Sequence, residues 1–420
     1  MKVSELTGVS PWTPDAHANQ LDDDNVSPAH ATPVAPTTLV KPIKILTCLH
    51  SFDPGGVERV ALRLNSRWHE SGAEVRLVIG RDTDASRPGL RTLARGLPCE
   101  IIPGGEHIDR RTQLPWMLRH LPAIIRRERP DVLFCAGNTY SSVAVGMKII
   151  LGRQCPPIIA KVSNDLERRD MGPLLRFSYH RWLRAQARYI ELYVGMAPAM
   201  TAEIAHATGL GGDRITIVND PILRATELER FAGIHVARGV PNGARRFVAI
   251  GRMMPQKNFA LLLRAFARMA TATDRLTILG EGPERPILTA LAASLGIADR
   301  VAMPGHVADL PIWLSDADVF VMSSDYEGVP AVLIEAIAAN LGVVATDCSV
   351  SMRDLVGNGA FGELVPVGDE AALAAAMARA PLSQRDQAAA LDHARHFTLE
   401  QGAADYLSLM HDLVARTKRG

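Results

Sequence analysis

The stretch Ser324-Asp325-Tyr326-Glu327-Gly328-Val329-Pro330-Ala331-Val332-Leu333-Ile334-Glu335 joins two segments of different character. The run Val319–Met322 before it is apolar and largely β-branched or aromatic, which predicts a buried strand. Residues 331–339 are rich in helix formers, with apolar side chains at three- and four-residue spacing, and predict a helix. Gly328 and Pro330 mark the turn between them, because proline suits the first turn of a helix.

Two carboxylates flank this predicted helix start: Glu327 in the turn, and Glu335 one to two turns into the helix. The free N–H groups and the positive dipole end of a helix start attract phosphate. Carboxylates at the same place would repel phosphate unless they face something else, and hydroxyl groups are their natural partners. The pattern therefore fits a ligand with a diphosphate between two polyhydroxylated rings, which describes a sugar nucleotide.

The same residues carry a family resemblance. E-G-V-P at residues 327–330, followed by E-A-I-A at residues 335–338, resembles the E-x7-E motif of glycosyltransferase family 4. The resemblance implies a retaining enzyme of the α/β class with the GT-B fold, in which two Rossmann-like, doubly wound parallel-sheet domains face a central cleft. It implies that Glu335 accepts hydrogen bonds from the donor ribose and Glu327 from the donor sugar. It implies donor binding by the residues between them, namely Gly328, Val329 and Pro330.

Composition sets the broad class of the protein. The 420 residues are 47% hydrophobic, which is enough for two domains of ordinary size. The formal net charge of +1 gives no field that favours nucleic acid, and no nucleic-acid-binding motif is present. The five cysteines are scattered and form no C-x-x-C pair, which predicts reduced thiols, with Cys48 and Cys135 in the core. With neither a signal peptide nor an apolar run of ~20 residues, we expect a cytoplasmic protein.

A glycine pair follows the first predicted strand, residues 43–49, and precedes a predicted helix over residues 57–68. Glycine lets a ligand approach the backbone closely, although a plain tight turn explains a glycine pair equally well. G-G-V-E-R at residues 55–59 resembles the G-G-x-E-R loop of the family, and this implies that Gly55 and Gly56 lie over the donor phosphates. Glu58 and Arg59 fall on the predicted helix, where a structural role is the alternative.

Strands and helices continue to alternate through residues 74–135, which predicts a parallel sheet with helices on both faces. Ligands of such sheets bind beyond the carboxyl ends of the strands. Ser51 and Asn138 follow predicted strands, and together with Asn164 they are our candidates for the acceptor side. Many family members have a histidine near residue 138. Asn138 could replace its hydrogen bonds but could not act as a base.

The second half of the chain contains a pair of cations in a similar setting. A predicted strand over residues 246–250 ends in Gly251-Arg252, and a loop then carries Lys257 to a helix predicted over residues 259–270. Two fixed cations at a strand end and a helix start can hold a diphosphate, whereas two solvated surface cations are the alternative. The resemblance to the G-R-x4-K motif of the family implies that Arg252 and Lys257 meet the leaving diphosphate, with Glu327 as the third catalytic residue.

Two further segments resemble donor-binding parts of the family. Residues 276–283 predict a strand that ends at Gly280 and resemble the G-x-G-P motif, and residues 301–307 resemble the segment whose backbone receives the nucleotide base. His306 and Val307 are then expected to form a wall of that pocket.

Two D-x-D triplets, Asp82-Thr83-Asp84 and Asp316-Ala317-Asp318, match the metal motif of the other large transferase fold. Such two-residue patterns arise by chance among 45 acidic residues, and the second triplet fits ordinary helix-end and turn chemistry. We expect no metal, and no cofactor beyond a nucleoside-diphosphate sugar as co-substrate.

Residues 174–190 predict a helix that mixes arginines with large apolar side chains, the arginines being Arg176, Arg181, Arg184 and Arg188. This composition fits contact with anionic lipid headgroups, and it equally fits an amphipathic helix with a solvated basic face. The resemblance favours the membrane, because many relatives build lipid-linked glycans. A peripheral position on the cytoplasmic face of the inner membrane is therefore expected.

The chain divides into three predicted parts. Residues 1–40 have little periodicity and predict a disordered tail. Residues 41–222 predict an acceptor-side domain that a terminal helix, residues 400–418, completes, and residues 223–399 predict the donor-binding domain. Asp220-Pro221 stands at the end of the first domain, where the family usually has an Asn-Gly turn.

We therefore expect a retaining, metal-independent glycosyltransferase that moves a sugar from a nucleoside-diphosphate sugar to a glycan or lipid-linked acceptor in polysaccharide or glycoconjugate biosynthesis. Two alternatives stay open: a sugar-nucleotide 2-epimerase, and a catalytically silent sugar-nucleotide-binding scaffold in which Asn138 and Asp220-Pro221 are departures from an ancestral site. The complete set of charged residues favours the transferase; it consists of Arg252, Lys257, Glu327 and Glu335. No nucleic-acid partner is expected.

Overall fold

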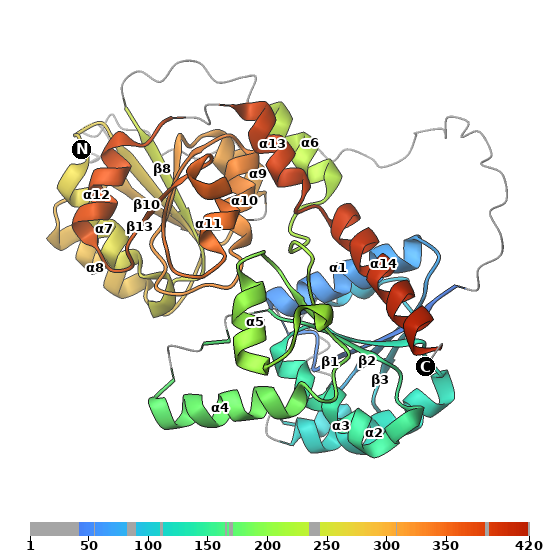
Figure 1. The fold of residues 1–420 in the computed structure, drawn as a ribbon. Coiled ribbons are helices and arrows are strands. Elements are labelled where there is room, and N and C mark those ends of the chain that lie inside the picture. The colour runs from blue at the N-terminus through green and yellow to red at the C-terminus, as the bar shows by residue number, and fades with distance from the viewer. Residues whose placement is uncertain are drawn as a thin grey trace, which may run out of the picture. The chain divides into compact units, whose positions relative to one another are not determined.

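The computed structural model describes residues 42–53, 55–81, 90–109, 112–163, 166–167, 171–234, 244–307, 309–382 and 386–418. Within them the chain forms two parallel β-sheets, each covered by helices (Figure 1). The predicted tail and the triplet Asp82-Thr83-Asp84 lie outside the described residues.

The first sheet has seven strands in the order β3-β2-β1-β4-β5-β6-β7, and each pairs with its neighbours in parallel. Its strands are β1 Lys44–Leu49, β2 Glu74–Ile79, β3 Cys99–Ile101, β4 Val132–Cys135, β5 Ile158–Lys161, β6 Leu192–Gly195 and β7 Ile215–Ile217. The helices between them are α1 Gly56–Glu70, α2 Gln113–Glu128, α3 Ser141–Leu151, α4 Pro173–Gln186 and α5 Met200–Thr208. The order reverses at β1 and β4, so the polar residues that follow these two strands lie at a switch point of the sheet.

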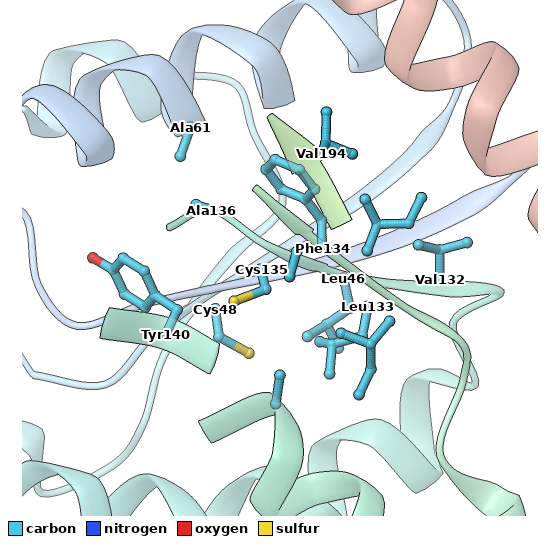
Figure 2. Close-up of a cluster of buried hydrophobic side chains, with 14 of the residues drawn as sticks. Leu46, Cys48, Ala61, Val132, Leu133, Phe134, Cys135, Ala136, Tyr140 and Val194 are labelled. Atoms are coloured by element: carbon cyan, nitrogen blue, oxygen red, sulfur yellow. The ribbon is translucent and has the colours of Figure 1, made fainter. Parts of the chain in front are cut away.

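The central strands of this sheet are apolar on both faces, as expected of a parallel sheet between helices. Leu46 and Phe134 belong to one cluster of buried side chains, in which Cys48 and Cys135 are buried thiols, as predicted (Figure 2). Tyr140 lies at the edge of the same cluster with its hydroxyl pointing away from it (Figure 2). All five cysteines are free.

The second sheet has six parallel strands in the order β10-β9-β8-β11-β12-β13. Its strands are β8 Arg246–Ile250, β9 Arg275–Leu279, β10 Val301–Gly305, β11 Val319–Met322, β12 Gly342–Thr346 and β13 Glu363–Val365. The helices of this half are α6 Ala225–Ile234, α7 Phe259–Met269, α8 Arg285–Ser294, α9 Leu310–Ser315, α10 Ala331–Ala338, α11 Met352–Leu355, α12 Glu370–Arg379 and α13 Gln387–Arg395. Here the order reverses at β8 and β11, the strands that precede Arg252 and Glu327.

The last helix, α14 Leu399–Thr417, packs on α1 of the first sheet, so the C-terminal end of the chain completes the N-terminal half (Figure 1). Two chain segments run between the halves, and a parallel bridge between Leu223 and Thr398 joins them. Next to the outgoing segment, the ammonium of Lys161 at the end of β5 lies 2.5 Å from a carboxylate oxygen of Asp220. Lys161 is 3% exposed, so the aspartate of Asp220-Pro221 neutralises a buried cation.

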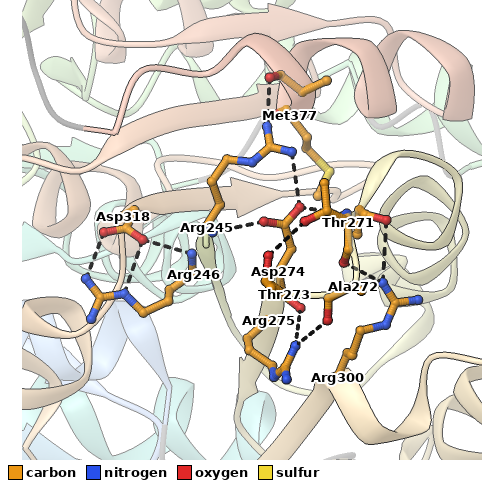
Figure 3. Close-up of polar contacts among 12 residues, drawn as sticks. Arg245, Arg246, Thr271, Ala272, Thr273, Asp274, Arg275, Arg300, Asp318 and Met377 are labelled. Carbon is orange, nitrogen blue, oxygen red and sulfur yellow. Dashed lines mark hydrogen bonds and ion pairs between the residues drawn. The ribbon is translucent and has the colours of Figure 1, made fainter. Parts of the chain in front are cut away.

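A separate group of charges lies where β8, β9 and β11 begin, at the other ends of these strands from Arg252 and Glu327 (Figure 3). The guanidinium of Arg246 pairs with Asp316 at 2.7 Å and with Asp318 at 2.9 Å, and Asp318 also accepts the Arg246 backbone N–H. Both carboxylates of the triplet Asp316-Ala317-Asp318 are thus engaged by one arginine, which matches the helix-end role that the sequence suggested for them.

Most predicted elements are present within one or two residues of their predicted bounds. Two differences stand out: the predicted helix over residues 174–190 ends at Gln186, and no strand was predicted at β5, β6, β7, β10 or β13. The chain turns after Gln186 because Ala187 and Ile190 are buried on the way into β6. No helix in the described part of the chain is both long and apolar enough to span a membrane.

Candidate functional site

The turns after β8 and β9 pack backbone against backbone. The N–H of Gly251 donates to the carbonyl of Leu279 at 2.9 Å, and the N–H of Met253 donates to that of Glu281 at 2.9 Å. A Cβ on Gly280 would lie 2.0 Å from the carbonyl oxygen of Gly251, and Gly280 has a φ of +135°. Gly280 therefore has to be glycine for two independent reasons, its left-handed backbone and this close approach.

The loop that carries Lys257 is bonded to the loop after β11. The side-chain amide of Gln256 donates to the carbonyl of Tyr326 at 2.8 Å, and the Gln256 carbonyl accepts the N–H of Asp325 at 2.9 Å. The Ser323 hydroxyl donates to the Lys257 carbonyl at 2.9 Å. These contacts fix the positions of Lys257 and Glu327 relative to each other, although 70 residues separate them in the sequence.

The ammonium of Lys257 lies 2.5 Å from a carboxylate oxygen of Glu327. Both side chains are mostly buried, with exposures of 18% and 11%, so little solvent screens the pair. Arg252, on the turn after β8, is exposed, and its guanidinium has no ion pair within the described ranges. The structure thus brings Lys257 and Glu327 together and leaves the charge of Arg252 available to a ligand.

Glu335 lies on α10, where burial raises its pKa from the ordinary 4.5 to about 7. The carboxylate of Glu227 on α6 raises this pKa further, whereas the guanidinium groups of Arg63 and Arg59 on α1 lower it. Arg63 is held by the Ile222 carbonyl at 2.9 Å. A carboxyl group with a pKa near 7 is poorly solvated, and this favours acceptance of hydrogen bonds from a ligand's hydroxyl groups.

The turn between Glu327 and α10 is anchored from both sides. The Ser349 hydroxyl donates to the Gly328 carbonyl at 3.0 Å, and Val329 packs against the core clusters of both sheets. Pro330 is buried and directly precedes the first residue of α10, as the sequence predicted. The residues predicted to line the base pocket follow β10, with His306 exposed and Val307 partly buried.

In the first sheet, the Gly55–Gly56 turn begins α1. Gly55 is the residue before the helix, and a Cβ there would lie 2.0 Å from a carboxylate oxygen of Glu58. The hydroxyl of Tyr140 donates to the other carboxylate oxygen of Glu58 at 2.5 Å. The imidazole of His50 stacks on the Tyr140 ring with 4.4 Å between their centroids, and burial lowers the pKa of His50.

The predicted acceptor-side residues take part in local contacts. The Ser51 hydroxyl is buried and accepts the N–H of Asp53 at 3.2 Å. The Asn138 side-chain oxygen accepts the N–H of Ser163 at 3.0 Å, so Asn138 ties the end of β4 to the end of β5. Asn164 lies outside the described residues. An acceptor-binding role for these three residues stays a prediction.

Sequence reasoning missed the residues that hold the site in place, above all Gln256 and Tyr140. Gln256 lies inside the G-R-x4-K spacing at a position that any residue could occupy, and Tyr140 contacts Glu58 across 82 residues of sequence. Glu58 carried half of a signal, because it stands at the third helical position, where the acid of a capping box lies, but Gly55 lacks the hydroxyl group that completes this motif. The described part of the chain contains no group of three or more His, Cys, Asp or Glu side chains arranged so that it could hold a metal ion.

Two family models, both of glycosyltransferases, match successive parts of the chain. The model described as Glycosyltransferase Family 4 matches residues 54–222, and the model described as Glycosyl transferases group 1 matches residues 244–380. Together these matches span more than half of the chain.

Two relatives show how similarity is distributed. The lipopolysaccharide core biosynthesis glycosyltransferase LpsE of Rhizobium meliloti is 27% identical over 339 residues, which are 79% of this chain and 87% of that protein. The N-acetylgalactosamine-N,N'-diacetylbacillosaminyl-diphospho-undecaprenol 4-alpha-N-acetylgalactosaminyltransferase of Campylobacter jejuni is 37% identical over 123 residues. That shorter match spans 29% of this chain and 33% of the relative.

The structure of HepE from Anabaena in complex with UDP and glucose superposes with a TM-score of 0.68. It covers 87% of this chain and 99% of that chain at 19% identity, a likeness that concerns the fold. Two Rossmann-like parallel sheets, two family models and these relatives agree: the protein has the GT-B fold and is a glycosyltransferase of the family 4 type.

Proposed function

We propose that this glycosyltransferase takes a sugar from a nucleoside-diphosphate sugar, with retention of anomeric configuration and without a metal ion, and transfers it to a glycan or a lipid-linked acceptor in glycoconjugate biosynthesis. The observation that carries the proposal is the fixed Lys257–Glu327 pair at 2.5 Å beside the exposed Arg252. The two cations, Arg252 and Lys257, can receive the charge that grows on a leaving diphosphate.

The donor is assigned to the second sheet. In this proposal Arg252 and Lys257 bind the diphosphate, together with the N–H groups of the Gly55–Gly56 turn. Gly251 and Gly280 shape the turns beneath it, since their own N–H groups donate to the carbonyls of Leu279 and Gly305. Glu335 accepts hydrogen bonds from the ribose. His306 and Val307 line the base, and the turn Gly328–Val329–Pro330 lies along the diphosphate. HepE, whose structure contains UDP and glucose, supports a donor of this chemical class.

Glu327 is assigned to the hydroxyl groups of the transferred sugar. Its carboxylate is already hydrogen-bonded to Lys257, which lowers its nucleophilicity and suits it to binding rather than to attack on carbon. The acceptor hydroxyl would then attack on the face that the diphosphate leaves, and the departing phosphate oxygen would take its proton.

The acceptor is assigned to a membrane surface, because α4 exposes apolar side chains next to arginines. Leu174 is 81% exposed, Phe177 61% and Trp182 42%, and α4 contains no acidic residue. Large apolar groups with cations beside them match the interface of an anionic bilayer. The Campylobacter relative, whose name includes a diphospho-undecaprenol acceptor, supports a lipid-linked substrate.

A product screen tests the proposed reaction. The purified protein is incubated with a panel of nucleoside-diphosphate sugars and a lipid-linked acceptor fraction, and products are identified by mass spectrometry. We expect one donor to yield a glycosylated acceptor and free nucleoside diphosphate, with turnover lost in Lys257→Ala and Glu327→Ala. Donor binding without any release of nucleoside diphosphate would identify a silent scaffold instead.

Vesicle sedimentation tests the membrane surface separately. We expect the protein to sediment with phosphatidylglycerol vesicles and not with phosphatidylcholine vesicles. The variant Leu174→Ser/Phe177→Ser/Trp182→Ser should stay in the supernatant, whereas Ile287→Ser, which removes a 65% exposed side chain from α8, should sediment like the wild type. Equal sedimentation of both variants would assign the exposed face of α4 another role.

A further inference from the structure

A partly buried hydrogen bond joins the helix start after the Gly55–Gly56 turn to the sheet. Tyr140, two residues into the segment after Asn138, is 2% exposed, and its hydroxyl donates to Glu58 at 2.5 Å. Glu58 is the third residue of α1, one turn from the glycines. The carboxylate of Glu58 is therefore held on one side by a phenol that solvent does not reach.

The other side of this carboxylate meets the backbone of Gly55. A Cβ on Gly55 would lie 2.0 Å from one Glu58 oxygen, so the carboxylate occupies the space that a side chain at residue 55 would need. The Arg59 N–H donates to the Gly55 carbonyl at 3.1 Å. The Glu58 carboxylate therefore packs against the backbone of the turn that precedes the helix.

Tyr140 is itself fixed by its surroundings. Its ring stacks on His50 at an interplanar angle of 25°, and the His50 carbonyl accepts the side-chain N–H of Gln113 at 2.6 Å and the N–H of Arg81 at 2.8 Å. Burial raises the pKa of Tyr140 above its ordinary value, so the phenol stays protonated and can donate. Tyr140 thus connects the ends of β1 and β4 with the first turn of α1.

We propose that Tyr140 is a positioning residue for donor binding: its hydroxyl holds the Glu58 carboxylate against Gly55 and so fixes the N–H groups of the Gly55–Gly56 turn. This inference rests on the proposed function, in which that turn binds the donor diphosphate. Tyr140 thereby keeps the Glu58 carboxylate in contact with the turn.

The affinity ratio between a nucleoside diphosphate and the matching monophosphate tests this role. Isothermal titration with UDP and UMP, GDP and GMP, and ADP and AMP first identifies the pair that the wild-type protein binds. In Tyr140→Phe we expect the preference for the diphosphate over the monophosphate to fall about tenfold, with the monophosphate affinity unchanged within about twofold. A general loss of protein stability would weaken the binding of both ligands alike and would leave the affinity ratio unchanged.

Matched variants complete the test. Tyr193→Phe also removes a hydroxyl from a buried tyrosine of the first sheet, one that has no hydrogen-bond partner in the described chain, and should keep the wild-type ratio. Glu58→Gln retains an oxygen that accepts a hydrogen bond from Tyr140 and should keep the wild-type affinity ratio. Glu58→Leu has no such oxygen, so its preference for the diphosphate should fall as it does in Tyr140→Phe. The double variant Tyr140→Phe/Glu58→Leu should lose no more than either single change.

Two results would overturn the inference. A wild-type preference for diphosphate that survives in both Tyr140→Phe and Glu58→Leu would remove the role of Tyr140 and leave the proposed function intact. Absence of binding to every nucleoside diphosphate in the wild-type protein would instead remove the proposed function, and this inference with it.

Discussion

At the scale of single residues, the site depends on charges placed where solvent screens them poorly. Lys257 and Glu327 form a pair at 2.5 Å, and so do Lys148 and Glu191 on the outside of the first sheet. The two pairs have the same length and the same chemistry. They differ in that Lys257 lies on a loop bonded to the loop after β11, with its side chain packed against Gly251, the residue before Arg252.

This similarity provides a matched comparison. We expect Lys257→Ala to weaken nucleoside-diphosphate binding roughly 30-fold, because one charged hydrogen bond is lost and Glu327 is left unpaired. Lys148→Ala removes an equally short ion pair and should change the affinity by less than about twofold. Isothermal titration of both variants with the preferred diphosphate checks this, and similar losses in the two would mean that Lys257 acts through stability alone.

Glu335 gives a prediction that depends on pH. Its pKa is raised from 4.5 to about 7, mainly by burial, so its ionisation costs the folded state more than the unfolded state. The stability that the protonated Glu335 contributes is fully present below pH 4.5 and is lost as the pH rises through about 7. Glu335→Gln should therefore raise the free energy of unfolding at pH 8 by about 2 kcal/mol and have little effect near pH 4.5.

Urea denaturation of Glu335→Gln and wild type at both pH values measures this difference. The same variant should bind the nucleoside diphosphate more weakly at pH 8, because an amide offers the ribose one acceptor oxygen in place of two. A gain in stability that is equal at both pH values would show that burial of the charge is not its cause.

At the scale of elements, backbone contacts between strand ends hold the turns of the proposed donor site. Gly280 combines a φ of +135° with a Cβ position 2.0 Å from the Gly251 carbonyl, so Gly280→Ala has to separate the turns after β8 and β9. We expect it to lower the free energy of unfolding by about 3 kcal/mol and to weaken donor binding. Gly212→Ala, where nothing lies within 4 Å of the added Cβ, should be close to neutral in both assays.

The strands and helices also show which parts of the fold the sequence could predict. The strand Val319–Met322 and the helix that begins at Ala331 are where periodicity and the glycine-proline turn indicated, because local propensity and burial agree there. Strand β5 was not named, since its four residues include the buried Lys161, whose partner Asp220 lies far along the chain. Pattern reasoning finds elements whose cause is local, and it misses those that a distant partner stabilises.

The candidate site likewise contains residues that a local motif identifies and residues whose role depends on distant contacts. Gly251, Arg252, Lys257, Glu327 and Glu335 were identified because each lies at a fixed spacing within a local motif. Tyr140 could not be identified, since its importance arises from a contact with Glu58 that only the folded sheet creates. For Ser51 and Asn138, residue type suggested ligand contact, whereas their side chains bond to neighbouring backbone.

At the scale of the whole molecule, the two halves are connected by segments that the first sheet anchors. Asp220 precedes the outgoing segment and pairs with Lys161 of β5. Tyr406 of the returning α14 is fully buried, and burial together with the nearby charge of Asp220 raises its pKa. One buried ion pair thus lies among a strand, the outgoing segment and the last helix.

Removal of Asp220 should therefore affect folding more than a surface change would. We expect Asp220→Ala to lower the free energy of unfolding by about 3 kcal/mol, because Lys161 loses its counter-ion in a buried position. The exposed Asp213→Ala provides the control and should change it by less than about 0.5 kcal/mol. Partial recovery in Asp220→Ala/Lys161→Met, measured by urea denaturation, would confirm the buried charge as the cause; no recovery would contradict it.

The central claim for the whole enzyme is that two side-chain cations receive the charge of the leaving diphosphate. Single-turnover release of nucleoside diphosphate, at saturating donor and acceptor, tests it most directly in Arg252→Ala/Lys257→Ala against the wild type. Since one such donor contributes about 10²–10³ in rate, we predict that the double variant is slowed by at least about 10⁴ while Lys148→Ala retains the wild-type rate. Release by the double variant within tenfold of the wild-type rate would contradict the account.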